Sequence, residues 1–390
     1  MFSRRTQWQL APNRLSAALE KHRAAGREVL DLTVSNPTCI GLKYDELAIL
    51  KALVQPAALQ YHPDPRGLFT ARQAVAAYYA ERGVQVDPAR IILTTSTSEA
   101  YAFVFRVLCE PGDEVLVPAP SYPLFEFLAD LQDVRLARYL LLYDHGWQVD
   151  IHSLRAALTA RTRAIMLVHP NNPTGSYIKQ AEAVELGQIC RERELALVVD
   201  EVFLDFAHGE QPAASFAASD AALTFTLSGL SKIAGLPQMK FAWLAVSGPE
   251  PLRETALSRL EVIADTFLSM NAPIQHAAPV LFAQRQAFQT QLMQRIHHNL
   301  AELDGQLSGQ KLCTRLAIGG GWYAILRVPV TGSDEDFAVA LLEKQSVLVH
   351  PGHFYDFASE GYVVLSLIAP ESEFTEGVRR VIAWSLKPEA

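Results

Sequence analysis

The chain reads Ser228-Gly229-Leu230-Ser231-Lys232 directly after an apolar, strand-like run at residues 223–227. A lysine framed by small hydroxyl residues and glycine, just past the end of a strand, is placed to present one amine to a confined site. Such an amine forms a Schiff base with an aldehyde once burial or a neighbouring cation lowers its pKa. The alternative is a surface loop with a solvated lysine, and the pentapeptide alone fits that alternative at least as well.

On both sides of this stretch, short apolar runs alternate with helical segments. Strands are expected at residues 91–95, 115–117, 164–168, 196–199, 223–227 and 241–246, with helices at 99–109, 122–131 and 181–193. Continuous apolar runs of this length indicate strands that are buried on both faces. The pattern therefore predicts an α/β fold whose large domain holds a mostly parallel, seven-stranded sheet flanked by helices.

The C-terminal part of the chain changes character. After a long amphipathic segment at 273–303, strands are expected at 322–328, 346–349 and 362–368. Together with the N-terminal segment, these strands predict a smaller α+β domain. The expected division is 1–45 for the N-terminal segment of the small domain, 46–290 for the large domain and 291–390 for the rest of the small domain.

Composition narrows the range of partners. The chain has 390 residues, of which 49% are hydrophobic, and a net charge of −8 without a basic run, so neither nucleic acid nor an anionic membrane is expected as a partner. No apolar stretch reaches the roughly twenty residues that span a bilayer, and no apolar signal core follows the N-terminus, which favours a cytoplasmic protein. The cysteines lack metal-ligand spacing, so we expect no metal site.

Hydroxyl and aromatic side chains follow two of the expected strands, at the sheet edge where ligands bind. Ser96, Thr97 and Ser98 stand between a strand and a helix, where hydroxyls and helix N–H groups suit a phosphate; the alternative is an ordinary helix cap. Tyr122 is flanked by prolines and can stack on a flat heteroaromatic ring; the alternative is a core tyrosine.

Polar residues also follow two further strands. The run Asn171-Asn172-Pro173-Thr174-Gly175 is a rigid turn that can aim an amide at a ring oxygen, although a plain turn has the same composition. Asp200 ends an apolar strand, so its carboxylate needs a cationic partner such as a protonated pyridine nitrogen; a helix cap or a metal ligand is the alternative. Such a pairing keeps the ring an electron sink. These groups and Lys232 are chemically complementary to one cofactor, pyridoxal 5'-phosphate.

Taken together, Asn171 to Gly175, Asp200-Glu201, and Ser231-Lys232 with Gly235 resemble the class I and II aminotransferases, which are fold type I pyridoxal-phosphate enzymes. Order and spacing match from roughly Leu30 to the C-terminus. The resemblance implies a Schiff base at Lys232, a pyridine-nitrogen contact at Asp200, a phenolic-oxygen contact at Asn172, ring stacking at Tyr122 and phosphate contacts at Ser96, Thr97 and Ser98. It also implies a homodimer with shared active sites, in which Tyr61 reaches the phosphate held by the partner subunit.

Several positions at the cofactor make this chain a divergent member. Phe203 stands where the family usually has a tyrosine that bonds the cofactor oxygen, and Lys240 stands where it has a phosphate-binding arginine. Lysine lacks the bidentate fork of arginine and holds a phosphate less tightly. Gly229 replaces a phosphate-binding serine, and the neighbouring Ser228 can compensate.

The largest departure is Val364, which stands where the family carries an arginine that clamps the α-carboxylate of the substrate. Loss of that bidentate contact costs an ordinary amino acid about 2–4 kcal/mol. Arg66 and Arg327 are candidate replacements, and Asn36 is a further candidate substrate residue.

The sequence predicts an aminotransferase that moves an amino group between an amino acid and a 2-oxo acid through a lysine aldimine. Lys232, once freed from the cofactor, then acts as the general base. A lyase, decarboxylase or racemase on the same scaffold is the alternative, since the carboxylate clamp is missing. A non-catalytic pyridoxal-phosphate-binding regulatory protein is a second alternative.

Overall fold

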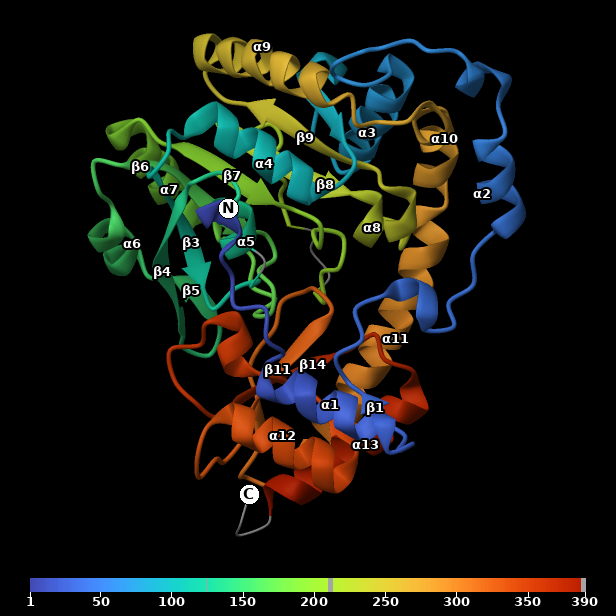
Figure 1. Cartoon of the computed structure of the whole chain (residues 1–390), viewed down its shortest axis with the longest axis vertical. Helices are drawn as coiled ribbons and strands as arrows, with labels where there is room; N and C mark the ends of the chain where they lie inside the picture. The colour runs from blue at the N-terminus through green and yellow to red at the C-terminus, as the bar shows by residue number, and fades with distance from the viewer. Residues whose placement is uncertain (124, 210–212, 387–390) are drawn as a thin grey trace.

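The computed structural model describes residues 1–123, 125–209 and 213–386. It contains a large sheet covered by helices and a smaller group of strands and helices beneath it, as Figure 1 shows. The α/β class and the smaller second domain that the sequence predicts are confirmed. None of the described helices combines the length and the apolar character that crossing a bilayer requires.

The large sheet has eight strands among the described residues, in the order β2-β9-β8-β7-β6-β3-β4-β5. Their bounds are β2 (Ile91–Thr94), β3 (Glu114–Ala119), β4 (Arg135–Tyr143), β5 (Trp147–Val149), β6 (Thr162–Val168), β7 (Ala196–Asp200), β8 (Thr224–Gly229) and β9 (Ala242–Ser247). The strands from β8 to β4 pair in parallel, whereas β9 pairs antiparallel with both of its neighbours. The mostly parallel sheet is confirmed.

The predicted count of seven strands is wrong. Six strand ranges were located in the sequence, and the two strands of this sheet without an expected range are β4 and its antiparallel partner β5, which form one edge of the sheet. Many side chains of β4 are exposed, Arg135 and Leu140 among them, and arginines interrupt its first half, so the strand does not have the pattern of one buried on both faces.

Alternate residues of the central strands pack on opposite faces of the sheet, as the two-residue period of a strand requires. Met166 of β6 belongs to a core cluster with α4 (Thr97–Leu108), α5 (Phe125–Asp130) and α9 (Glu250–Phe267). Its neighbour Leu167 belongs to the cluster on the other face, with α6 (Ile151–Ala157) and α7 (Gln180–Arg193). A third cluster joins the β2 and β9 edge to α2 (Glu46–Leu53), α3 (Phe69–Glu81) and α10 (Ala272–Ala283).

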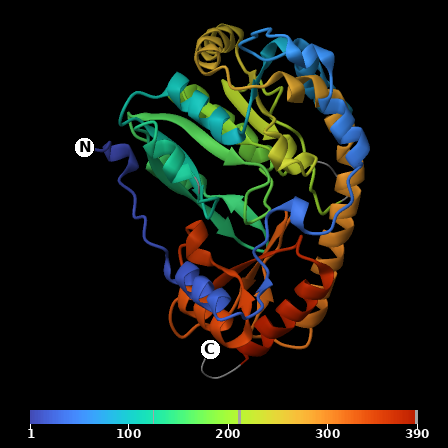
Figure 2. The ribbon, with the colours of Figure 1, turned by 45° about the vertical axis from the view of Figure 1, so that its right-hand side comes forward.

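The smaller domain combines the two ends of the chain. Its antiparallel sheet has the order β10-β11-β14-β13, with bounds β10 (Thr314–Arg315), β11 (Tyr323–Arg327), β13 (His350–Pro351) and β14 (Tyr362–Ser366). The N-terminal β1 (Leu30–Asp31) pairs in parallel with β12 (Val347–Leu348). Figure 2 shows the blue α1 (Arg14–Ala24) beside the orange and red α12 (Asp334–Gln345) and α13 (Glu371–Ser385).

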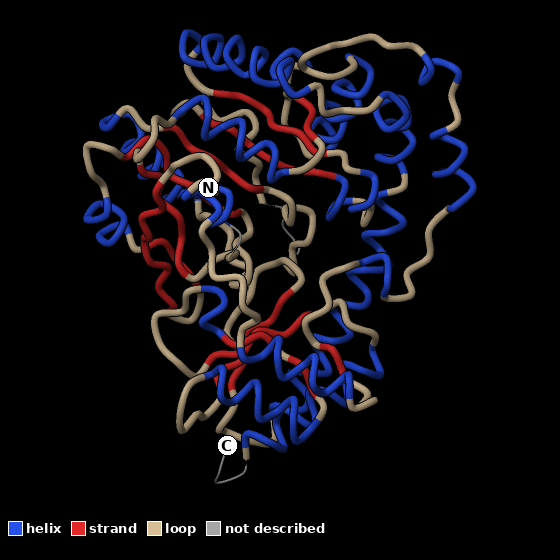
Figure 3. The backbone as a smooth tube through the Cα atoms, in the orientation of Figure 1, coloured by secondary structure: helices blue, strands red, loops and turns tan. Residues whose placement is uncertain are grey.

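The long segment expected at 273–303 is two helices, α10 and α11 (Arg285–Leu307), which meet at Gln284. In Figure 2 α11 runs along one side of the molecule from the large domain to the small one. We propose that the chain passes between the domains near residues 45 and 290, which keeps the division 1–45, 46–290 and 291–390. Figure 3 shows loops gathered between the two sheets, and these loops carry the site described below.

Candidate active site

Lys232 lies in a single helical turn, α8 (Leu230–Ile233), that begins where β8 ends. Its Nζ lies 4.8 Å from the centroid of the Trp322 ring and 5.5 Å from that of Phe203. Burial lowers the pKa of Lys232 to about 8, although the carboxylate of Asp200 acts in the opposite direction. The predicted strand-to-turn placement is what the structure has, and the amine is desolvated rather than displayed on a surface loop.

Gly235 lets this turn pack closely against α11. Its φ is +64°, and a Cβ added there would lie 2.2 Å from the Phe288 ring of α11. Both the left-handed backbone and the lack of space call for glycine. The Tyr44 hydroxyl donates to the Gly235 carbonyl at 2.9 Å and closes the turn from another side.

Asp200 is the last residue of β7, next to β8 in the sheet, and 8% of it is exposed. Its Oδ1 accepts from the Val202 backbone N–H at 3.0 Å, and its Oδ2 accepts from the Tyr101 hydroxyl at 2.8 Å. Burial raises the pKa of Asp200, and both hydrogen bonds and the charge of Lys232 oppose that rise. The two bonds leave the carboxylate fixed in position at the carboxyl edge of the sheet.

Sequence reasoning missed Tyr101. The signal was available, because Tyr101 follows Thr97 by one helical turn and therefore lies on the same face of α4. A buried tyrosine on a helix that begins at the ligand edge of the sheet needs a partner for its hydroxyl. In the structure that partner is Asp200.

One cavity of about 170 Å³ unites most of the predicted residues. Its lining includes Thr97, Ser98, Tyr122, Asn172, Asp200, Phe203, Ser231 and Lys232, all of which the sequence singled out. Ser35 and Tyr323 line it as well. A more open hollow beside it is lined by Lys232 and Asn36, so Asn36 lies at the edge of the site.

The two asparagines of the predicted turn have different roles. Asn171 donates to the Pro120 carbonyl and to Thr174 Oγ1, and it accepts from Ser121, so it ties two loops together. The buried Oδ1 of Asn172 has no hydrogen-bond partner. Because an unpaired buried polar atom is costly, this amide is suited to a ligand that occupies the cavity.

The three hydroxyl residues at the start of α4 have two different roles. Ser96 caps α4, with its Oγ accepting from the Glu99 backbone N–H at 3.1 Å, and it does not appear in the cavity wall. Thr97 and Ser98 line the cavity instead. The cap alternative therefore describes Ser96, while Thr97 and Ser98 keep the position expected of an anion site.

Four other predicted residues lie away from the cavity wall. Ser228 is buried, with its Oγ 3.5 Å from the Glu201 carbonyl, and Lys240 is exposed. Arg66 donates to Glu261 and to the Ala89 carbonyl, and Arg327 donates to the Tyr362 hydroxyl. Neither arginine is brought to Lys232 within this chain.

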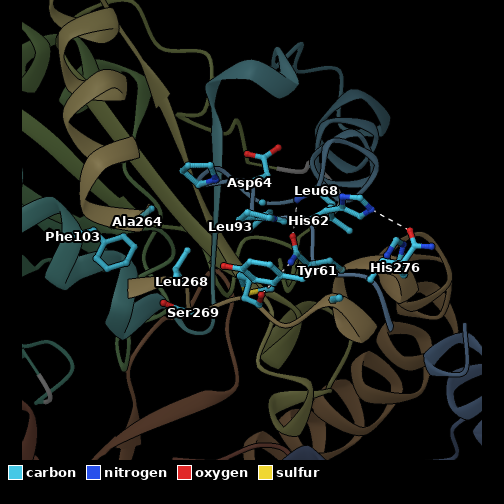
Figure 4. Close-up of a pocket in the computed structure, with 17 residues that line it drawn as sticks. Tyr61, His62, Asp64, Leu68, Leu93, Phe103, Ala264, Leu268, Ser269 and His276 are labelled. Atoms are coloured by element: carbon cyan, nitrogen blue, oxygen red, sulfur yellow. Dashed lines mark hydrogen bonds between the residues drawn. The ribbon is translucent and has the colours of Figure 1, made fainter. Parts of the chain in front are cut away.

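Tyr61 also lies outside the cavity, with 76% of its surface exposed. It lines a separate hollow of about 100 Å³ with His62, Asp64, Leu268 and His276, shown in Figure 4. A tyrosine in this position is open to a second molecule. It makes no contribution to the Lys232 cavity of its own chain.

Comparison with known proteins gives the family. The model of the family described as aminotransferase class I and II matches residues 27–380. The chain is 31% identical over 255 residues to the glutamate–pyruvate aminotransferase AlaA of Escherichia coli K12, an alignment that covers 65% of this chain and 63% of that protein. The protein of the same name from Haemophilus influenzae is 26% identical, with 91% of this chain and 90% of that protein covered.

Solved structures support the fold. The alanine aminotransferase from Pyrococcus furiosus has a TM-score of 0.90 at 23% identity, with 99% of this chain and 100% of that chain covered. An aminotransferase from Escherichia coli has a TM-score of 0.87 at 24% identity, with 100% and 99% covered. Since the family model spans most of the sequence, the chain belongs to the aminotransferase class I and II family.

Proposed function

We propose that the protein is a pyridoxal-phosphate-dependent aminotransferase that moves an amino group between an amino acid and a 2-oxo acid. The observation that carries the proposal is a single cavity that holds both a desolvated amine, Lys232, and a buried carboxylate, Asp200. Relatives from Escherichia coli and Haemophilus influenzae are named glutamate–pyruvate aminotransferases, which favours transamination over other chemistry on this scaffold.

The side chains around the cavity fit pyridoxal phosphate. Asp200 would pair with the ring nitrogen, and the side-chain N–H of Asn172 would donate to the phenolic oxygen. Thr97 and Ser98, with the N-terminal N–H groups of α4, would hold the phosphate, and Tyr122 would cover the ring. When bound, the protonated pyridine ring supplies an electron sink for charge that develops on the substrate carbon.

Lys232 has the acid–base properties that its proposed role requires. A general base works best when its pKa lies near the operating pH, and burial brings the pKa of Lys232 to about 8. The amine would hold the aldehyde carbon of the cofactor in the resting enzyme. After release it would take the proton from the substrate α-carbon and deliver it to that aldehyde carbon.

Phe203 limits the contacts to the phenolic oxygen, because it lines the cavity without a hydroxyl.

A lyase, decarboxylase or racemase remains the second candidate function, since the described cavity wall holds no arginine for a substrate carboxylate. The two candidates differ in their products, which the first experiment below measures.

We also propose a homodimer with shared sites. Large apolar side chains are exposed along α2 and the segment that follows it, namely Leu47, Leu50, Val54, Leu59 and Tyr61. Such a gathering marks a surface that another protein covers. A second copy there would bring Tyr61 to the phosphate of the partner's site.

The free cysteines are in keeping with a reducing compartment, and we propose the cytoplasm.

Transamination itself is tested with purified holoenzyme, about twenty amino acids and several 2-oxo acids. We expect a donor to convert the bound cofactor to pyridoxamine phosphate and an acceptor to restore it. Lys232→Ala should lower turnover by roughly 10²–10⁴-fold or more, because the general base is lost. Lys344→Ala, at an exposed site on α12, is the matched control. Full turnover by Lys232→Ala would remove the proposal, and release of pyruvate and ammonia would favour the lyase.

The protonation of Lys232 is measured on the cofactor-free protein by acetic anhydride labelling and peptide mass spectrometry. Only the neutral amine reacts, so labelling should be half-maximal near pH 8, well below the ordinary lysine value of 10.5. In Asp200→Asn the half-maximum should move to still lower pH, because the carboxylate stabilises the charged amine. A half-maximum near 10.5 would show that the amine is solvated.

The variant Tyr101→Phe tests whether the Tyr101 hydroxyl stabilises the carboxylate of Asp200. Removal of the hydroxyl takes one hydrogen bond from a buried carboxylate and raises its pKa further. Such bonds contribute about 1.5–3 kcal/mol, so we expect roughly 10–100-fold weaker cofactor binding by absorbance titration. Tyr139→Phe removes a hydroxyl that donates to the Met166 carbonyl at 2.8 Å, away from the cavity wall, and serves as control. Equal losses in both variants would contradict the assigned role.

The shared site is tested by mixing subunits. The mass in solution should be twice the 43.0 kDa of the chain. Lys232→Ala and Tyr61→Ala are each impaired, but a mixed dimer has one site with both wild-type side chains. Random mixing should therefore restore roughly a quarter of wild-type activity, as expected for a two-fold symmetric pair. No gain over Tyr61→Ala alone would place Tyr61 outside the partner's site.

A further inference from the structure

The amine of Lys232 lies against two aromatic rings. Its Nζ is 4.8 Å from the centroid of the Trp322 ring and 5.5 Å from that of Phe203. A ring face within about 6 Å attracts a cation through the negative charge density above the ring, and tryptophan does so most strongly. The attraction grows where water is excluded, and burial desolvates this amine. Both rings are therefore placed to favour the charged form of the amine.

The Trp322 ring has a fixed position. It is fully buried, and it meets the Phe203 and Phe206 rings edge to face, each at 5.2 Å between centroids. Its backbone carbonyl accepts from the Leu367 N–H at 2.7 Å. Directly before it, the Gly321 N–H donates to the Phe206 carbonyl at 2.8 Å, which joins this part of the small domain to the loop after β7. A ring that is already ordered loses little freedom when it binds a cation.

The indole N–H of Trp322 takes no part in this contact. Its buried Nε1 has no hydrogen-bond partner among the described residues. An unpaired buried N–H is costly, whereas an apolar side chain would fill the same space without that cost. The part of tryptophan that meets a functional group at this position is its ring face, which lies toward Lys232.

The carboxylate of Asp200 acts on the amine through its charge. Its two oxygens accept from the Val202 N–H and the Tyr101 hydroxyl. In the proposed function this carboxylate would pair with the pyridine nitrogen, so its charge would be compensated when the cofactor is bound. The ring faces of Trp322 and Phe203 would remain beside the amine in that state.

Resting on the proposed function, we propose that Trp322, together with Phe203, binds the ammonium of Lys232 whenever this amine is free of the cofactor. The lone pair of Nζ takes the proton from the substrate α-carbon, and the two ring faces stabilise the resulting positive charge. The lone pair is restored when the proton passes on to the aldehyde carbon. Because Trp322 touches the reacting nitrogen from the small domain, both domains take part in the proton transfer.

Three other titratable residues line the described cavity wall, namely Asp200, Tyr122 and Tyr323. Burial raises the pKa of both tyrosines, so they stay neutral while Lys232 titrates. Burial also raises the pKa of Asp200, and its hydrogen bonds and the charge of Lys232 oppose that rise. A change confined to the Trp322 ring alters none of these groups, so a shift in the protonation of Lys232 reports the ring contact.

Fluorinated tryptophans test the ring contact in the cofactor-free, full-length protein. Mono-, di- and tetrafluorotryptophan are incorporated at position 322, and each fluorine withdraws charge from the ring face with little change of shape. Lys232 is then titrated by acetic anhydride labelling. We expect half-maximal labelling near pH 8 in the wild type. It should move stepwise to lower pH with added fluorine, by about one unit for the tetrafluoro ring, which is a tenfold change in protonation. An unchanged half-maximum across the series would overturn the proposal.

Trp243 provides the matched control. It is fully buried like Trp322, but its Nε1 donates to the Tyr79 hydroxyl at 3.0 Å and its ring packs against Tyr78. The same fluorinated series at position 243 should leave the half-maximum of Lys232 labelling unchanged. An equal shift from position 243 would show a general effect of fluorine on the protein and would also overturn the proposal.

The two phenylalanines beside Trp322 give a second comparison. Both meet the Trp322 ring edge to face, and Nζ of Lys232 lies over the Phe203 ring. Pentafluorophenylalanine reverses the charge of the ring face. At position 203 it should therefore lower the half-maximum by about half a pH unit or more, while at position 206 it should have no effect. A shift from 206 and none from 203 would contradict the assigned pair of rings.

The holoenzyme tests the contact in the reaction. A saturating donor deuterated at the α-carbon makes removal of this hydrogen slow enough to set the single-turnover rate, which is followed by cofactor absorbance. Tetrafluorotryptophan at position 322 should lower this rate by about threefold or more, because an amine that holds its proton more weakly takes it more slowly. An unchanged rate would remove Trp322 from the proton transfer. If no donor changes the cofactor absorbance, transamination fails as the function, and the labelling series still decides whether the rings bind the ammonium.

Discussion

The structure of the site depends on a buried amine and a buried carboxylate at the ends of adjacent strands. β7 delivers Asp200 and β8 leads into the turn of Lys232, and the parallel pairing of the two strands puts both ends at one edge of the sheet. Neither group is stable there without help. Asp200 relies on the Val202 N–H and the Tyr101 hydroxyl, while the pKa of Lys232 is lowered to about 8. The surrounding packing therefore fixes an amine and a carboxylate in one cavity, where a ligand can contact both.

The arrangement of the two domains covers this carboxyl edge of the large sheet. The large sheet is buried on both faces by helices, so its polar groups meet at the carboxyl edge, where the small-domain sheet faces it (Figure 1). The small domain contributes Tyr323, and the N-terminal segment contributes Ser35. The residues that we propose for the cofactor therefore come from the large domain, and the cavity is completed from the small domain and the N-terminal segment.

The strands and site residues that could be predicted are those with a strong periodic or compositional signal in the sequence. The apolar runs that became β6, β7 and β8 and the polar groups that follow them were found, and eight of the predicted residues line one cavity. β4 was missed because arginines interrupt its first half and many of its side chains are exposed. Tyr101 was missed because a buried tyrosine has the same sequence signal in a core and in a site. Arg66 and Arg327 could not be placed, since the partners of a long side chain depend on tertiary packing.

The close contact between Gly235 and Phe288 has a mechanical consequence. Phe288 belongs to α11, which continues without a break to Leu307 in the small domain, and its ring fills the space where a side chain at 235 would be. The single helix α11 therefore connects the turn of Lys232 to the small domain. A displacement of α11 relative to the large domain would therefore press on the turn at Gly235, three residues after Lys232.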